Sequence, residues 1–356
     1  MILLKFNPAE KEILSYKMKA SIIILNWNGK HLLEECINSI LSQKFKDYEI
    51  IVVDNGSSDN SVEYLKEKYT SVIKIISLIQ NKGFAGGCNE GIKIAKGDYI
   101  VLLNNDAIVD EKWLSELINA ADSDNKIGMC ACKILNYYNR DEFDTLSHLI
   151  YPDGLNRGRA KFEKDHHQYD KFEEVFFPSG AAALYRKSML NEIGFFDEDF
   201  FLYGDDTDIG LRGRLAGWKC LYVPTAIAYH KSSASTHPYS PWKIYLVERN
   251  RILILFKYFP FRYILISPIY TIIRFWYNFI GIFLKKGSSF KFISKHSTLS
   301  LITAIIKAYA IAIILIPKIL FKRFTHIKKI KKISTTDFIN LLKKYKITAK
   351  ELSLKD

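Results

Sequence analysis

Acidic residues crowd one short stretch of the chain, FLYGDDTDIGLR at residues 201–212. Asp205, Asp206 and Asp208 fall within about one helical turn, and like charges this close repel each other unless the fold uses them. A carboxylate in such a place can serve as a general base that takes a proton from a hydroxyl group. A structural interpretation competes with this one: Asp205 would cap a helix and Asp208 would pair with Arg212 four residues on. Because that interpretation gives Asp206 no structural role, Asp206 is the candidate base.

Polar residues also close four of the apolar runs. Asn26 ends SIIILN, Asp54 ends EIIVVD and Asp106 ends YIVLLNND. A carboxylate such as Asp54 can accept hydrogen bonds from a nucleobase or a ribose. Alternatively, Asp54 is a turn residue, with the adjacent Asn-Gly pair as the turn itself. Asp106 offers the hard oxygen ligand that Mg²⁺ or Mn²⁺ prefers, and a helix cap is the alternative. His230 closes AIAYH and is a candidate second ligand, unless it is only a structural hydrogen-bonding residue.

A glycine-rich stretch, NKGFAGGCNEG at residues 81–91, is predicted to lead into a helix. Its glycines allow the backbone to approach a ligand closely, and the start of a helix offers N–H groups to a phosphate. Such loops are common, so this one gains weight only beside the other motifs. The turn NWNGKH is not a GxGxxG sequence, so a dinucleotide fingerprint is absent there.

The residues that surround these motifs predict an α/β fold. Apolar, β-rich runs alternate with helical periodicity, which indicates a parallel sheet covered by helices on both faces, with ligands at the carboxyl ends of the strands. Strands are predicted at 21–26, 49–54, 72–78, 99–106, 128–135, 218–224 and 226–230, and helices at 29–42, 61–69, 86–95, 111–121 and about 206–216. Residues 136–172 are polar and aperiodic, and we expect them to form a long excursion over one face. Apolar structure resumes at 175–186.

Taken in order, the motifs resemble the family 2 glycosyltransferases of GT-A fold, specifically the rhamnosyltransferase-like branch. The resemblance rests on IIILNWNG, VVDNGSSD, NKGFAGG, LLNNDA, SGAAALYR, GFFDEDFFLYGDDTDIGLR and YHKSS, and it covers about residues 20–251. It implies a Rossmann-like, mostly parallel sheet with helices on both faces. It also implies an inverting transfer of a sugar from a nucleotide-diphosphate donor to a glycan or lipid-linked acceptor in cell-surface polysaccharide assembly. The branch suggests rhamnose from a dTDP donor.

The resemblance assigns roles to individual residues. Asp106 takes the last acid of the family's metal-binding motif, whose first position here is Asn104, and with His230 it would hold Mg²⁺ or Mn²⁺. Asp206 matches the catalytic base, and Asp205 replaces the usual Glu. The donor nucleotide would be bound by Asn26, Trp27, Asp54, Lys82, Gly83 and Asn105, with Asp205, Asp208, Ser179 and Gly180 supporting the acceptor side. The replacements at 104 and 205 would also fit an inactive nucleotide-sugar-binding scaffold.

The C-terminal part of the chain has a different character. Residues 285–356 carry 17 Lys and Arg against three acids, a net charge of +14, whereas residues 1–284 have a net charge of −1. Apolar segments at 252–284 and 297–321 are interrupted by Lys257, Arg262, Arg274 and Lys307. The pattern favours helices that lie in the interface of an anionic membrane, with a spanning helix or an ordinary helical subdomain as alternatives. The basic tail offers few aromatic residues for stacking on bases, so no nucleic-acid partner is expected.

These features predict four parts. An N-terminal extension (1–19) precedes the GT-A domain (20–250), an apolar and basic helical region (251–333) and a tail (334–356). The N-terminal segment lacks the apolar run of a signal peptide, so we expect a peripheral or monotopic protein at the cytoplasmic face of the membrane. The five cysteines show no CxxC pair, which indicates buried thiols rather than a zinc site or a disulfide framework.

Overall fold

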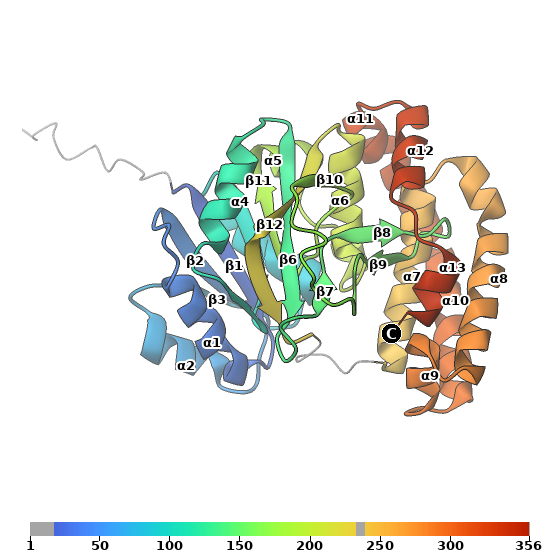
Figure 1. Ribbon diagram of the computed structural model, residues 1–356, viewed down its shortest axis with the longest axis horizontal. Helices are drawn as coiled ribbons and strands as arrows, with labels where there is room; N and C mark the ends of the chain where they lie inside the picture. Colours follow the sequence, from blue (N-terminus) through green and yellow to red (C-terminus); the bar gives the residue numbers. More distant parts are fainter. Residues whose placement is uncertain (1–17, 233–238, 356) are drawn as a thin grey trace, which may run out of the picture.

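The computed structural model describes residues 18–232 and 239–355, so nearly all of the predicted N-terminal extension lies outside the described residues. A ten-stranded sheet forms the centre of the described part, and the C-terminal helices stand beside it (Figure 1). The strand order is β10-β12-β6-β11-β4-β1-β2-β3, with β5 and β7 paired to β12 and β6. Buried apolar side chains fill both faces of this sheet.

The first half of the sheet is parallel, as the sequence predicts. Its strands are β1 (Ala20–Asn26), β2 (Tyr48–Asp54), β3 (Lys74–Ser77) and β4 (Tyr99–Asn104). The helices between and after them are α1 (Lys30–Leu41), α2 (Ser61–Tyr69), α3 (Gly83–Ile94) and α4 (Trp113–Asp122). In the register, Asn26 lies opposite Asp54 and Leu25 lies opposite Asn104, so the polar strand ends meet at one edge.

The second half of the sheet is mixed. β6 (Ile127–Asn136) and β12 (Lys219–His230) are parallel, whereas β11 (Ala182–Arg186) runs antiparallel between β4 and β6. β11 is reversed because the chain enters it at the carboxyl end of β4, where the amide of Asn104 donates to the carbonyl of Ala181 (2.9 Å). The two strands predicted at 218–224 and 226–230 are one strand, β12, with an irregular register between Val223 and Ile227.

The polar segment 136–172 contains three strands of three residues each, too short to show a period. They are β7 (Phe143–Thr145), β8 (His148–Ile150) and β9 (Asn156–Gly158). β8 and β9 form a two-stranded sheet, and Ile150 of β8 also bridges Lys346 in the tail. We call residues 143–158 the hairpin segment. Two further short strands, β5 (Ala107–Val109) and β10 (Glu173–Val175), pair antiparallel with β12.

The remaining helices lie between the sheet and the C-terminus. They are α5 (Lys187–Ile193), a 3₁₀ turn η2 (Glu198–Phe200), α6 (Asp205–Leu215), α7 (Pro241–Tyr258), α8 (Phe261–Phe283), α9 (Gly287–Ile293), α10 (Thr298–Lys322), a π-helical turn η3 (Arg323–Ile327) that continues α10 into α11 (Lys328–Ile330), α12 (Thr335–Lys344) and α13 (Ala349–Leu354). The predicted boundary at residue 250 falls inside α7, most of which is buried. The tail packs back on the fold, since Phe338, Leu342 and Tyr345 join the main core. All five cysteines are buried and free, so this prediction is confirmed.

Candidate active site

Three polar side chains at the ends of β1, β2 and β4 form a connected chain. The side-chain amide of Asn105 donates to Asn26 Oδ1 (2.8 Å), and the amide of Asn26 donates to Asp54 Oδ1 (3.0 Å). The other oxygen of Asp54 accepts from the amide of Ser57 (3.0 Å), which fixes the carboxylate in the turn after β2. These are three of the predicted nucleotide-binding residues, and the strand register brings them together.

Trp27 and Asn26, which are neighbours in the sequence, differ in the exposed fraction of their side chains. Trp27 stands at the surface, 39% exposed, where its indole can stack on a base. Asn26 is completely buried, at 0% exposure, so its contribution is to orient Asp54 and Asn105 from below.

The glycine-rich loop is held by asparagines. Asn55 donates to Asn81 Oδ1 (3.0 Å) and to the carbonyl of Gly83 (3.0 Å), and it accepts from the amide of Lys82 (2.9 Å). Gly83 has φ +73°, and a Cβ there would lie 2.3 Å from the carbonyl oxygen of Phe201. The loop therefore packs directly on the segment that precedes α6, which explains the need for glycine at this position.

The backbone amides and the lysine of this loop, which were expected to bind a phosphate, already have partners within the protein. The amide of Gly83 donates to Asn81 Oδ1 (2.7 Å) and that of Ala85 to the carbonyl of Phe201 (3.3 Å). The ammonium of Lys82 pairs with Glu90 on the same helix (2.8 Å). These donors serve the protein itself in this structure, so a phosphate would have to compete with them.

Asp106 and His230 meet at the same edge of the sheet. β5 pairs with β12 so that Ala107 lies opposite His230, and His230 Nε2 is 3.1 Å from Asp106 Oδ1. The other ring nitrogen, Nδ1, is 2.8 Å from Asp144 Oδ2. Burial alone lowers the pKa of His230, but the two carboxylates outweigh burial and raise the pKa to about 10. The imidazole thus sits between two anionic groups.

This arrangement offers candidate ligands for a divalent cation. In the described structure Asp106 Oδ1 and His230 Nε2 are separated by 3.1 Å as an ion pair, so a cation would have to displace the imidazole proton before both atoms could bind it. A metal-binding histidine commonly gives its second nitrogen to a carboxylate, which is the place that Asp144 takes. Asn104 adds a side-chain amide 3.4 Å from His230 Nε2.

The candidate base, Asp206, has a partner that the sequence did not suggest. Its Oδ2 lies 3.0 Å from Nε2 of His148, which is the first residue of β8. Its Oδ1 accepts from the amide of Thr207 (2.7 Å). Burial raises the pKa of Asp206, but His148 and Thr207 more than compensate, so the pKa is lowered. At 17% exposure the carboxylate still reaches the surface.

The neighbouring acids behave differently. Burial and the charge of Asp206 hold the pKa of Asp205 well above its ordinary value. Asp205 is the first residue of α6 and Gly204 is its N-cap, with no side-chain cap bond, so the expected cap by Asp205 is wrong. A left-handed residue, with φ +81° at Gly204, starts this helix instead.

Asp208 is fully buried in an ion cluster. It contacts Arg212 (Nε 3.0 Å), as expected for an i, i+4 pair, and also Lys257 and Tyr258 of α7. With no exposed surface it supports α6 from inside and cannot touch an acceptor.

The turn that leads into α6 is clamped by α7. Phe201, Tyr203 and Gly204 all have positive φ, which is costly for the first two. Asn250 donates to the carbonyls of Phe200 (2.9 Å), Leu202 (3.0 Å) and Tyr203, and Arg249 adds a bond to Phe200 (2.8 Å). These bonds hold the strained turn and thereby fix the start of α6.

Gly180 lies against the candidate base, and Ser179 precedes it in the same turn. A Cβ on Gly180 would be 3.9 Å from the Cβ of Asp206 and 3.2 Å from the ring of Phe84. The carbonyl of the next residue, Ala181, accepts from the amide of Asn104, which lies two residues before the candidate ligand Asp106. This turn therefore connects the Asp106 end of the site with the Asp206 end.

Sequence analysis missed Asp144, His148 and Asn250. The first two lie four residues apart in the hairpin segment and reach opposite ends of the site. The pattern DTLSH was the available signal, but a polar aperiodic stretch gives no means of telling which acid or histidine points inward. Asn250 stands in ERNR, where a charged run on a helix is usually solvent-exposed.

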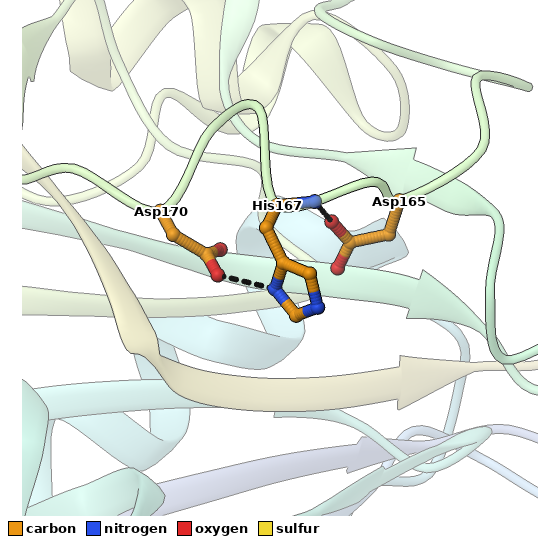
Figure 2. A group of neighbouring side chains, drawn as sticks. All are labelled: Asp165, His167 and Asp170. Atoms are coloured by element: carbon orange, nitrogen blue, oxygen red, sulfur yellow. Dashed lines mark hydrogen bonds and ion pairs between the residues drawn. The ribbon is translucent and has the colours of Figure 1, made fainter.

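A second group of possible metal ligands lies outside this site. Asp165, His167 and Asp170 have ligand atoms within 4.8 Å of one another (Figure 2). Lys133 Nζ is 2.9 Å from Asp165 and also pairs with Asp170, so an ammonium already supplies the positive charge there. The clustering of these acids is explained by their ion pairs with Lys133, without a metal ion.

Comparisons with known proteins agree with this fold. Residues 21–194 match the family described as Glycosyl transferase family 2. The chain is 32% identical over 185 residues to the poly(ribitol-phosphate) beta-glucosyltransferase of Bacillus spizizenii, covering 49% of this chain and 26% of the relative. It is 26% identical over 218 residues to the poly-beta-1,6-N-acetyl-D-glucosamine synthase of Staphylococcus aureus, covering 59% of this chain and 49% of the relative. The chain thus spans half or less of these relatives.

A solved structure shares the fold. The crystal structure of GalNAc-T7 with UDP, GalNAc and Mn²⁺ superposes with a TM-score of 0.55 at 17% identity, covering 67% of this chain and 47% of that one. The described chain therefore has the GT-A fold that the sequence predicts, a mostly parallel sheet with helices on both faces.

Proposed function

We propose, from the premise that residues 21–194 are a domain of glycosyl transferase family 2, that this chain is an inverting glycosyltransferase. It moves a hexose from a nucleotide-diphosphate donor to a glycan or lipid-linked acceptor of a cell-surface polysaccharide. The observation that carries the proposal is the convergence of two pairs at one edge of the sheet. Asp106 with His230 offers a cation site, and Asp206 with His148 offers an ionised base.

The donor end accounts for nucleotide binding. Trp27 stacks on the base, while Asp54 and Asn105, oriented by Asn26, receive the nucleoside. Asp106 and His230 would hold Mg²⁺ or Mn²⁺, which neutralises the charge of the departing diphosphate.

The acceptor end accounts for the chemistry. The acceptor hydroxyl oxygen forms a bond to the anomeric carbon as the bond from that carbon to the diphosphate oxygen breaks. Asp206 accepts the hydroxyl proton in this step. One base on the face opposite the leaving group gives a single displacement and hence inversion. Asp205, kept neutral by burial and by its neighbour, leaves Asp206 as the sole charged carboxylate of the pair.

A membrane location suits the C-terminal helices. Among the described residues, one helix, Thr298–Ile330, is long and apolar enough to cross a bilayer, with 17% of its most apolar window buried. α8 and α10 expose large apolar side chains, among them Leu265, Ile269, Ile272, Trp276, Ile306, Ile313 and Ile314. An exposed apolar surface of this size is typical of a membrane or protein contact, and the basic residues beside it favour anionic lipid.

The attachment of α10 to the catalytic domain favours a monotopic arrangement. Arg251 bonds Tyr309, and Lys322 pairs with Asp197 (2.6 Å) and Asp199 (2.7 Å). Because α10 is bound along its length to polar groups of a water-soluble fold, crossing the bilayer would require it to detach. These contacts support the proposal that α8 and α10 lie in the membrane interface, and the cytoplasmic face stays part of the proposal.

The test is a panel of UDP-, dTDP- and GDP-sugars assayed for thermal stabilisation with Mn²⁺. A ligand at about 100 times its Kd stabilises by about 2.7 kcal/mol. We expect one donor to stabilise the protein only with metal, and Asp106→Ala to lose that effect while retaining its unliganded melting temperature. Rhamnose from dTDP-rhamnose stays a prediction of the resemblance, and the panel tests it directly.

Transfer or donor hydrolysis then separates an enzyme from a scaffold. An enzyme releases the nucleoside diphosphate, and NMR of the product gives an anomeric configuration opposite to that of the donor. Metal-dependent donor binding without release under any acceptor would favour the inactive scaffold instead.

A further inference from the structure

His148 reaches the candidate base from an element that belongs to neither the donor loop nor α6. It is the first residue of β8, and its Nε2 lies 3.0 Å from Asp206 Oδ2. Because Oδ1 of Asp206 already accepts from Thr207, the imidazole and the helix amide together engage both carboxylate oxygens. One oxygen is thus held by a hydrogen bond and the other is in contact with the imidazole at ion-pair distance.

The imidazole is itself held in place. Its Nδ1 lies 3.1 Å from the side-chain amide nitrogen of Asn156 on β9, across the hairpin. When that amide donates to Nδ1, the ring proton is at Nε2 and faces Asp206. The ring stacks on Phe177 with centroids 5.4 Å apart and planes 18° apart, and the amide of His148 donates to the carbonyl of Phe177 (3.1 Å). Such fixation on three sides is what a positioning group requires.

The other titratable groups around Asp206 do not supply positive charge. Asp205 and Asp208 lie on the same helix, Tyr185 of β11 lies near Asp206, and Cys88 of α3 lies near Asp205. Burial keeps the pKa of Tyr185 and of Cys88 well above their ordinary values, so both are neutral. Asp208 is neutralised by Arg212 and Lys257. His148 is therefore the group that can favour the ionised form of Asp206.

We infer that His148 is a positioning residue that orients Asp206 and keeps it ionised while an acceptor hydroxyl approaches. The inference rests on the proposed function, in which Asp206 is the base. An N–H at Nε2 serves this purpose in both the neutral tautomer and the imidazolium, so His148 needs no proton transfer of its own.

The experiment compares His148→Ala with His148→Gln, whose Nε2 can take the place of the ring nitrogen. In His148→Ala, we expect kcat to fall about tenfold or more, but less than the 10²–10⁴ typical for loss of a general base. Donor affinity and the KM for donor should stay within about twofold. His148→Gln should recover most of kcat. The acid limb of the kcat–pH profile should move to higher pH in His148→Ala, because the pKa of Asp206 is no longer lowered by the imidazole.

A merely structural role for His148 would give a different result. The Ala and Gln variants would then lose activity and melting temperature together, with the acid limb unmoved, and that outcome overturns the inference. If His148→Ala does not fold, Asn156→Ala provides the second test, since it frees Nδ1 without touching Asp206. We expect a smaller shift of the acid limb in the same direction, and an unchanged profile would also overturn the inference.

The failure of this inference is distinguishable from failure of the proposed function. If Asp206→Asn is inactive while His148→Ala has normal kcat and an unmoved acid limb, only the role of His148 is wrong. If Asp206→Asn itself turns over normally, the assignment of the base is wrong and this inference falls with it.

Discussion

Asp205 and Asp206 are adjacent carboxylates that the fold treats in opposite ways. Asp205 is buried without a positive partner, so its pKa rises, whereas the pKa of Asp206 is lowered by His148 and Thr207. Two neighbouring acids with pKa values pushed apart are a recurrent sign of an acid–base site. The crowding of acids in the sequence is thus resolved by protonation of one and pairing of the other.

This difference leads to a prediction for two matched variants. Asp206→Asn keeps the size of the side chain but cannot take a proton, so turnover should fall by about 10²–10⁴. Asp205→Asn should have a small effect, because Asn resembles the neutral acid already present. Steady-state turnover and donor binding by calorimetry test both. A collapse confined to Asp205→Asn would move the base by one residue.

A second prediction at the level of single residues concerns Asp144 and the affinity for Mn²⁺. Its carboxylate accepts from His230 Nδ1 and pairs with Lys161 (2.7 Å). Loss of such a carboxylate behind a metal-binding histidine typically costs 10–100-fold in metal affinity. We expect Asp144→Asn to weaken Mn²⁺ binding by about that factor in a calorimetric titration.

Asp170→Asn is the control for this titration, since it alters the other acidic group, paired with Lys133. An unchanged affinity in Asp144→Asn with a loss in Asp170→Asn would relocate the metal to the site of Figure 2.

Among the elements, α7 has the most consequence for the site. Its Asn250 bonds three carbonyls of the turn that precedes α6, two of whose residues have positive φ without being glycine. Burying those carbonyls without their donor costs about 1–3 kcal/mol. The turn is therefore maintained by a helix that lies more than 40 residues further along the chain.

We predict that Asn250→Ala lowers the unfolding free energy by about 1–3 kcal/mol and reduces kcat, while Mn²⁺-dependent donor binding persists. Chemical denaturation and donor titration measure these effects. Asn191→Ala, at an exposed position of α5, is the matched control. Loss of donor binding in Asn250→Ala would show that the turn also shapes the nucleotide site.

Element by element, the sequence predicts structure best where apolar periodicity is long. β1, β2, β4 and β6 lie within one or two residues of their predicted bounds, and Asn26, Asp54 and Asp106 were identified because strand ends are visible in the sequence. The hairpin segment could not be predicted, since a three-residue strand has no readable period. His148 and Asp144 depend on that segment. The antiparallel direction of β11 depends on where the chain turns back into the sheet, and no local sequence pattern indicates that position.

At the scale of the whole molecule, a buried ion network joins the catalytic half to the C-terminal helices. Glu248 of α7 contacts Arg251 (2.8 Å) and Arg274 of α8 (2.7 Å), and Arg274 contacts Asp153 of the hairpin segment (2.8 Å). Burial raises the pKa of Glu248, but the two arginines outweigh it and lower the pKa from 4.5 to about 2. The network thus connects α7, α8 and the segment that carries His148.

This lowered pKa makes stability depend on acidity. A carboxylate with a depressed pKa contributes stability that is present above its unfolded pKa and is lost as the pH falls toward the folded value. The contribution of Glu248 is therefore complete above about pH 4.5 and disappears toward about pH 2.

We predict that Glu248→Gln, which leaves Arg251 and Arg274 to share the single carboxylate of Asp153, costs about 3–5 kcal/mol at pH 7 and makes the acid slope shallower. Urea unfolding at several pH values measures both quantities. Glu116→Gln, an exposed acid that bonds Thr225, is the control. An equal acid slope in wild type and Glu248→Gln would assign the acid sensitivity to other carboxylates.

The apolar faces of α8 and α10 lead to a prediction about attachment. Trp276→Glu and Ile313→Glu should each weaken binding to anionic vesicles roughly tenfold or more, because each removes about 1.5–3 kcal/mol of apolar burial. Ile79→Glu changes an even more exposed apolar residue, which lies near the end of β3 and away from α8 and α10, and should have no effect. Vesicle flotation in low and high salt gives the measurement. Resistance to alkaline carbonate extraction would favour a spanning α10.

The four-residue spacing of Asp144 and His148 restricts which insertions and deletions the protein can tolerate during evolution. β7 and β8 are three residues each, and side chains in a strand alternate between faces, so inserting or deleting one residue between them would turn one of the two away from the site. Random drift at 145–147 should therefore exchange residue types while preserving length, with Asp144 and His148 retained. A library of single-residue insertions and deletions would lose activity at 146–147 and tolerate changes in the exposed turn at 139–140.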